Sequence, residues 1–89
     1  MRTSLRLSNI PEYMHEGIIN YLFYHVEPGD FLRNLLQNNL LGTFGNADST
    51  NSSLIKEYIL FFYKNVPIIV WGSEEKYNKW INKRKEKKE

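Results

Sequence analysis

The strongest constraint on the fold is the apolar stretch at residues 54–71, LIKEYILFFYKNVPIIVW. Its first part carries apolar residues at positions 54, 55, 58, 59, 62 and 63, which is the spacing of one helical face. Leu60 and Phe61 extend the apolar surface to the other face, and a helix that is apolar nearly all round is normally buried on more than one side. A chain of 89 residues has little core in which to bury such a helix. The segment is therefore expected to be the central helix of a small bundle or part of a subunit interface.

Helical periodicity and helix-start signals predict an all-α fold. Pro11 suits the first turn of a helix that Ser8 or Asn9 can cap, and Asp30 can cap the second helix. Ser73 precedes two acidic residues, which together indicate the start of the last helix. We predict helices near residues 11–25, 30–45, 51–65 and 73–86, forming an oligomeric bundle of about four helices. The domain is predicted at 10–82, with an extended arm at 1–9, where Leu5 and Leu7 alternate with polar residues, and a charged C-terminal tail at 83–89.

The middle of the chain has the weakest helical signal. Asn38 and Asn39 fall inside the second predicted helix, where asparagine has poor propensity, so they face either solvent or a ligand. The run NADSTNSS at 46–53 predicts a loop, or a helix that breaks and restarts. The β-branched residues 68–70 favour an extended segment crossing the end of the bundle.

Charge and composition limit the possible partners. The sequence has no cysteine, which excludes disulfide chemistry and fits a reducing cytosol. Neither a signal peptide nor an apolar run of membrane-spanning length is recognised. Residues 74–89 carry seven Lys or Arg and four Glu, a net charge of +3, whereas residues 1–73 carry −1. Because the folded part lacks a basic excess, stable binding to a nucleic-acid duplex is not expected.

No residue pattern predicts catalysis, a cofactor or a metal site. His15 and His25 lie ten residues apart, without the close ligand spacing of a metal site. Glu12 and Glu16 share one helix face rather than opposite sides of a cleft. No serine lies in a nucleophile elbow, and no glycine pattern matches a phosphate-binding loop. The sequence therefore predicts a protein that is not an enzyme.

Aromatic rings near the predicted helix ends make ligand binding a better hypothesis. Flat rings stack on nucleobases, lysines meet phosphates, and helix starts favour anions. The alternative for each ring is an ordinary place in the core. The rings concerned are Tyr13, Tyr24, Tyr63, Trp71 and Tyr77, and the nearby lysines are Lys64, Lys76 and Lys79.

Several segments together resemble a group of short proteins encoded by bacteriophages and prophages. The order is IPEYM, EGIINYLF, EPGDFLRNLLQNNLLGTFGNAD, KEYILFFYKNVP and WGSEEKYNKWI, which covers roughly residues 10–81. The pattern is similar to the anti-CBASS protein 2 family of helical sponges that sequester cyclic nucleotide immune signals. This resemblance implies a homo-hexamer in the cytoplasm of the bacterial host, with pockets between protomers for cyclic dinucleotides and separate pockets for cyclic trinucleotides.

The resemblance and the positions of rings and lysines together define a candidate ligand-binding set. Its members are Tyr13, His25, Pro28, Gly29, Asp30, Lys64, Trp71, Gly72, Ser73 and Lys76. The hypothesis is a sponge that binds cyclic oligonucleotides and releases them intact. Two alternatives remain open: a phage protein that inhibits a host enzyme, and a small DNA-binding accessory protein.

Overall fold

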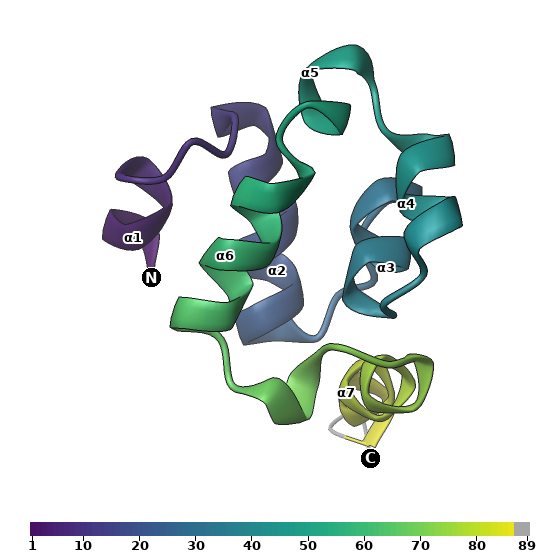
Figure 1. Ribbon diagram of the computed structural model, residues 1–89. Helices are drawn as coiled ribbons and strands as arrows, with labels where there is room; N and C mark the ends of the chain where they lie inside the picture. The colour runs from purple at the N-terminus through teal and green to yellow at the C-terminus, as the bar shows by residue number, and fades with distance from the viewer. Residues whose placement is uncertain (87–89) are drawn as a thin grey trace.

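Helices account for all the regular structure in the described part of the chain. The computed structural model describes residues 1–86, in which there are seven α-helices, two single-turn 3-10 helices and no strand (Figure 1). This confirms the all-α class. The elements are α1 (Arg2–Arg6), η1 (Glu12–Met14), α2 (His15–Tyr24), α3 (Asp30–Leu36), α4 (Leu40–Asn46), α5 (Ser49–Ser52), α6 (Ile55–Asn65), η2 (Ile68–Val70) and α7 (Glu74–Glu86).

One apolar core joins helices that are distant in the sequence. Its most deeply buried large side chains are Tyr21 on α2, Leu36 on α3, and Tyr58 and Phe62 on α6. The radius of gyration is 12.5 Å, close to the value of about 12 Å expected for a compact domain of this length. Residues 1–86 therefore pack as a single unit.

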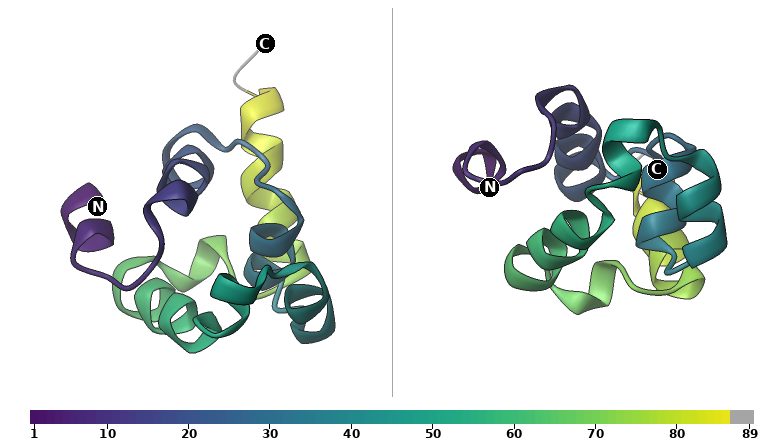
Figure 2. Two further views of the ribbon diagram at one scale, coloured as in Figure 1. Left: turned by 90° about the horizontal axis from the view of Figure 1, so that it is seen from above. Right: turned by 45° about the horizontal axis from the view of Figure 1, so that its top comes forward.

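The arrangement differs from a simple bundle of parallel and antiparallel helices. In Figure 1, α2 and α6 are seen from the side, whereas α7 is seen end-on; the left view of Figure 2 shows α7 along its length. Helix α7 therefore crosses the other two rather than running beside them. Among the described residues, no helix combines the length and apolar character needed to cross a bilayer.

Helix α6 buries one side of the apolar stretch and exposes the other. Phe61, predicted to lie at a subunit interface, is only 5% exposed and packs edge-on against Phe62 within the core. Leu60 is 39% exposed, and its neighbour Tyr63 lies on the surface. Of the two residues expected to extend the apolar surface to the other face, Phe61 thus lies in the core, and Leu60 remains partly exposed.

The N-terminal segment is not the extended arm that was predicted. Residues Arg2–Arg6 form α1, which buries Leu5 in the core and leaves Leu7 83% exposed. The two leucines alternate in sequence, but two steps along a helix place them on different faces. An ion pair of 3.3 Å between Arg2 and Glu16 connects α1 to α2.

Two asparagines divide the second predicted helix. Asn38 has a φ of 62°, a left-handed conformation that asparagine tolerates better than most residues, and it separates α3 from α4. Asn39 then caps α4, since its side chain accepts a hydrogen bond from the N–H of Gly42 at 3.1 Å. The prediction of one continuous helix over 30–45 is therefore wrong at this point.

Other local predictions also need correction. Residues 68–70 form the turn η2 rather than an extended segment. Asp30 is the first residue of α3 and does not cap it, because its carboxylate pairs with Arg33 at 2.8 Å instead. Helix α7 continues through residues 83–86 of the predicted tail, and 87–89 lie outside the described residues. The predicted cap at Ser73 is confirmed, since its hydroxyl oxygen accepts the N–H of Lys76 at 3.1 Å.

Candidate functional site

A cavity of about 320 Å³ lies where the start of α2, the start of α3 and the segment joining α4 to α5 come together. Its lining combines two aromatic rings, a small apolar surface, two carboxylates and two side-chain amides. The residues are Tyr13, Met14, Gly17, Gly29, Asp30, Phe31, Leu32, Asn46, Asp48 and Asn51. We call this space the Tyr13 cavity.

The exposed ring of Tyr13 is held by a network of hydrogen bonds. Its hydroxyl donates to Oδ2 of Asp48 at 2.6 Å, and Oδ1 of Asp48 accepts the backbone N–H of Asn51 at 2.6 Å, capping α5. The buried side chain of Asn51 in turn accepts a hydrogen bond from the hydroxyl of Tyr58. The ring, although 62% exposed, is therefore connected to the core residue Tyr58 through Asp48 and Asn51.

The same network sets the charge of the cavity wall. The hydrogen bond from Tyr13, followed by that from the N–H of Asn51, holds the pKa of Asp48 below its ordinary value of 3.8. The hydrogen bond to Asp48 correspondingly raises the pKa of Tyr13 above 10.0. At neutral pH the wall therefore presents a carboxylate beside a neutral phenol, and a carboxylate can only accept hydrogen bonds.

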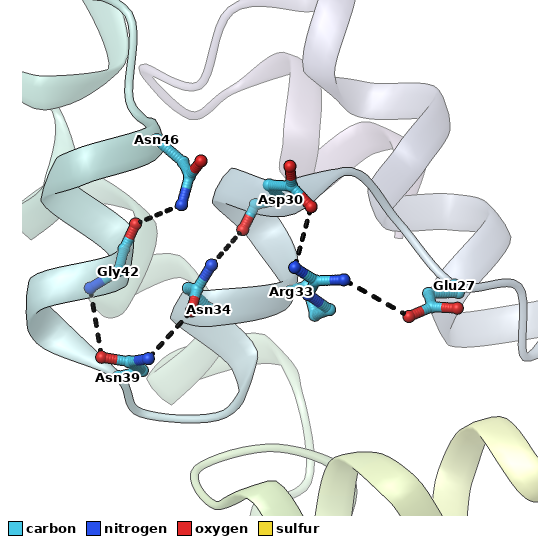
Figure 3. A network of polar contacts seen from close by, with 7 residues as sticks. All are labelled: Glu27, Asp30, Arg33, Asn34, Asn39, Gly42 and Asn46. Atoms are coloured by element: carbon cyan, nitrogen blue, oxygen red, sulfur yellow. Dashed lines mark hydrogen bonds and ion pairs between the residues drawn. The ribbon is translucent and has the colours of Figure 1, made fainter.

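A polar corner between α3 and α4 positions the opposite wall (Figure 3). The amide of the buried Asn34 donates to the carbonyl oxygen of Asp30 at 2.7 Å and accepts a hydrogen bond from Asn39 at 2.9 Å. Farther along α4, the amide of Asn46 donates to the carbonyl oxygen of Gly42 at 2.8 Å. Asp30 at the start of α3 and Asn46 at the end of α4 thus reach the cavity from one rigid corner.

Three of the ten predicted binding residues line this cavity: Tyr13, Gly29 and Asp30. Pro28 is half-buried and precedes Gly29 without lining the space. His25 is buried at the C-terminal end of α2, where its Nδ1 lies 3.0 Å from the carbonyl oxygen of Trp80 and its ring packs against the indole. The contacts of His25 therefore fasten α2 to α7.

The predicted residues around the start of α7 form a separate group. Trp71 is buried, donates through Nε1 to the carbonyl oxygen of Val66 at 3.3 Å, and packs against Phe62. Gly72 has a φ of 102°, which favours glycine, and its N–H donates to the carbonyl oxygen of Leu36 at 2.7 Å. Figure 1 places α5 and α7 at opposite ends of the molecule, so Trp71, Gly72, Ser73 and Lys76 do not share a site with Tyr13 in one protomer.

Among the residues that the structure describes, no lysine or arginine lines the Tyr13 cavity. Lys64 is exposed near the end of α6, and Lys76 is half-buried in the first turn of α7. The phosphate contacts expected from these lysines are therefore absent from this cavity within a single protomer. Its two carboxylates favour a ligand part that is neutral or rich in N–H groups.

A second, larger cavity lies on the other side of the 3-10 turn η1 (Glu12–Met14) from the Tyr13 cavity. It measures about 770 Å³ and is lined by Arg2, Leu5, Arg6, Ile10, Glu12, His15 and Glu16. Its charges are mixed: Arg2 already pairs with Glu16, and Nε2 of His15 lies 2.8 Å from the carbonyl oxygen of Ile10. These contacts engage Arg2, Glu16 and His15 within the chain.

Sequence reasoning missed the residues that hold Tyr13 in place. The available signal was Asp48 within the run at 46–53, because an aspartate directly before a helix start is a good cap. The hydrogen bond between Tyr13 and Asp48 spans 35 residues and has no local signature. Phe31 and Leu32 were expected only to be apolar helix residues.

The described residues contain no cluster of three or more His, Asp or Glu side chains arranged to hold a metal ion. Comparison with protein-family models, curated proteins and solved structures found no match to this chain.

Proposed function

We propose that the protein binds and sequesters cyclic di- or trinucleotide second messengers without cleaving them. The observation that carries the proposal is the exposed ring of Tyr13 at the edge of a 320 Å³ cavity with an apolar floor. A nucleobase is flat, and stacking on an aromatic side chain is worth about 1–3 kcal/mol. The cavity has room for a base, and the remainder of the ligand lies at its mouth.

The charge of the cavity determines which part of the ligand enters. Asp48 repels phosphate, whereas Asp30 is paired with Arg33 at 2.8 Å; a base brings N–H donors that a carboxylate accepts. The phosphates accordingly face solvent, where salt screens the repulsion over about 8–10 Å. Lysine contacts to the phosphates, if they are made, come from a neighbouring protomer.

Sequestration without cleavage follows from the family resemblance and is consistent with the groups around the cavity. The nearest histidine in sequence, His15, lies on the other side of the turn and is engaged with the carbonyl oxygen of Ile10. The proposal therefore assigns no catalytic residue. The setting implied by the resemblance is a phage protein acting in the cytoplasm of its bacterial host.

The proposal includes a homo-oligomer, with a hexamer as the form that the resemblance implies. Support comes from apolar side chains on the outer face of α6, where Ile59, Leu60 and Tyr63 are exposed. Burying such a face against a second copy removes apolar area from water at about 25 cal/mol per Å². Oligomerisation is also the route by which lysines of one protomer can approach the Tyr13 cavity of another.

The test is calorimetric titration of the wild type and of Tyr13→Ala with cyclic di- and trinucleotides, followed by chromatography of the recovered ligand. Losing one stacked base predicts roughly tenfold to a hundredfold weaker binding by the variant. Tyr24→Ala is the matched control, because Tyr24 is 63% exposed and lies outside the cavity. Equal loss in both variants, or recovery of linear product, would contradict the proposal.

Helix α4 favours the second candidate, a protein that binds and inhibits a host enzyme. Leu40, Leu41 and Phe44 are exposed together on this seven-residue helix. Exposed apolar groups of this kind mark protein interaction sites. If the purified wild type binds no cyclic nucleotide but co-purifies with one host enzyme, and Leu41→Glu abolishes that association, this second function is the correct one.

A further inference from the structure

The Tyr13 cavity contains an acceptor in a fixed position, and this arrangement bears on which base it accepts. The hydroxyl of Tyr13 and the N–H of Asn51 each use one lone pair on a different oxygen of Asp48, at 2.6 Å in both cases. A carboxylate has about four acceptor positions, so each oxygen keeps one for a ligand. Asp48 lines the same cavity as Tyr13, so a donor inside the cavity can approach this carboxylate.

A base bound in this cavity therefore meets a carboxylate acceptor on the wall that also carries Tyr13. Guanine carries N1–H and the N2 amino group side by side, and the two N–H groups match the two oxygens of one carboxylate. Adenine offers only its N6 amino group, next to the lone pair of N1, which a carboxylate repels. The nearby carboxylate of Asp30 adds to the preference for donors.

The amides of the cavity wall are consistent with this preference. One N–H of the Asn46 amide is engaged with the carbonyl oxygen of Gly42 at 2.8 Å, which leaves its second N–H and its oxygen for a ligand. Asn46 thus adds one acceptor to the two carboxylates, and among the described residues no lysine or arginine lines the cavity. The carboxylates can only accept, and a ligand with adjacent donors satisfies them best.

We infer that the Tyr13 cavity selects guanine over adenine through Asp48, an inference that rests on the proposed function of binding cyclic oligonucleotides. The expected preference of the wild type for cyclic di-GMP over cyclic di-AMP is roughly five- to a hundredfold, the range of one bidentate contact to a base. Asp48 is the specificity-determining residue, and Tyr13 supplies stacking without regard to base identity.

The decisive variant is Asp48→Asn. Asparagine caps a helix as well as aspartate does: its oxygen can still accept the N–H of Asn51, and its NH₂ group can donate to the hydroxyl oxygen of Tyr13, so the fold should be retained. One oxygen of the bidentate acceptor becomes an NH₂ group, which repels N1–H of guanine and suits N1 of adenine. The ratio of the two affinities should fall to near one or invert.

The control is Glu57→Gln, which makes the same change of charge outside the cavity and keeps an acceptor for the amide of Asn9. Affinities of the wild type and both variants for the two cyclic dinucleotides are measured by calorimetry at one salt concentration, and circular dichroism verifies folding. Glu57→Gln should retain the wild-type ratio.

The outcomes separate this inference from the proposed function. Equal affinity of the wild type for both ligands, with loss of both in Tyr13→Ala, would overturn the base preference and leave sequestration standing. An unchanged ratio in Asp48→Asn would overturn the role of Asp48. Absence of binding to either ligand by the wild type would overturn both proposals.

Discussion

Replacing Gly42 with alanine should destabilise the protein, although alanine normally improves a helix. A Cβ placed on Gly42 overlaps the side-chain amide of Asn34 and comes within 2.9 Å of the amide nitrogen of Asn39. Asn34 is buried and holds two hydrogen bonds, to Asp30 and Asn39, that it loses if it swings away. The substitution therefore breaks the corner drawn in Figure 3.

The magnitude of this effect follows from two opposing terms. Leaving buried polar groups without partners costs about 1–3 kcal/mol, whereas Gly→Ala within a helix gains about 0.5–1 kcal/mol. The net loss for Gly42→Ala is about 1–2 kcal/mol. For a domain of this size that lowers the Tm by roughly 4–16 °C. Because the corner positions Asp30 and Asn46, ligand affinity should fall as well.

Gly45→Ala is the matched control on the same helix. No atom lies within 4 Å of a Cβ built on Gly45, so only the gain in helix propensity remains. Its Tm should stay the same or rise by a few degrees. The assay is thermal and urea denaturation followed by circular dichroism, and equal Tm values for the two variants would refute the steric reasoning.

A double-mutant cycle tests the assigned contact directly. In an Asn34→Ala background the obstructing amide is gone, so adding Gly42→Ala should cost nothing or stabilise the protein. The coupling energy between the two sites should then be about 1–2 kcal/mol, a value typical of side chains in contact. Additive effects of the two substitutions would show that Asn34 is not what Gly42 must avoid.

Two further predictions concern α6 and Asp48. Phe61→Glu should unfold the chain, since an unpaired charge in the core costs several kcal/mol, whereas Leu60→Glu should leave the chain folded and dissociate the proposed oligomer. Circular dichroism detects the unfolding and sedimentation detects the dissociation. A monomeric wild type at micromolar concentration would contradict the oligomer. Because the pKa of Asp48 is lower in the folded chain, its stabilisation is complete above about pH 4 and is lost as the pH falls through the folded-state pKa. The Tm difference between wild type and Asp48→Asn should accordingly shrink below pH 4, and a constant difference from pH 6 to pH 2 would argue against the hydrogen bonds assigned to Asp48.

The helical class and the start of α7 could be predicted because their signals are local. Apolar spacing reports one helix face, and Ser73 caps α7 with its own side chain. The break at Asn38 could not be predicted with the same rules, since its left-handed backbone depends on how α3 and α4 pack. The burial of Phe61 likewise depends on partners distant in sequence, including the ring of Phe62 and the helices around it.

The candidate site was predictable only in part, for a similar physical reason. Tyr13 stood out as an aromatic residue near a helix start, and Gly29 and Asp30 as a turn. Their partner Asp48 reaches Tyr13 only after the chain between them has folded. Trp71 looked like a stacking ring but is buried against Phe62, because a large apolar ring near a small core is usually taken into it.

The most direct test of the proposed site is a chemical-shift map of the backbone amides during titration with cyclic di-GMP. If the base enters the Tyr13 cavity, the amides of residues 13–17, 29–32 and 46–51 should shift most, and Tyr13→Ala should require roughly tenfold to a hundredfold more ligand for the same shifts. Largest shifts in residues 71–76 at the start of α7, or no shifts at all, would contradict the account.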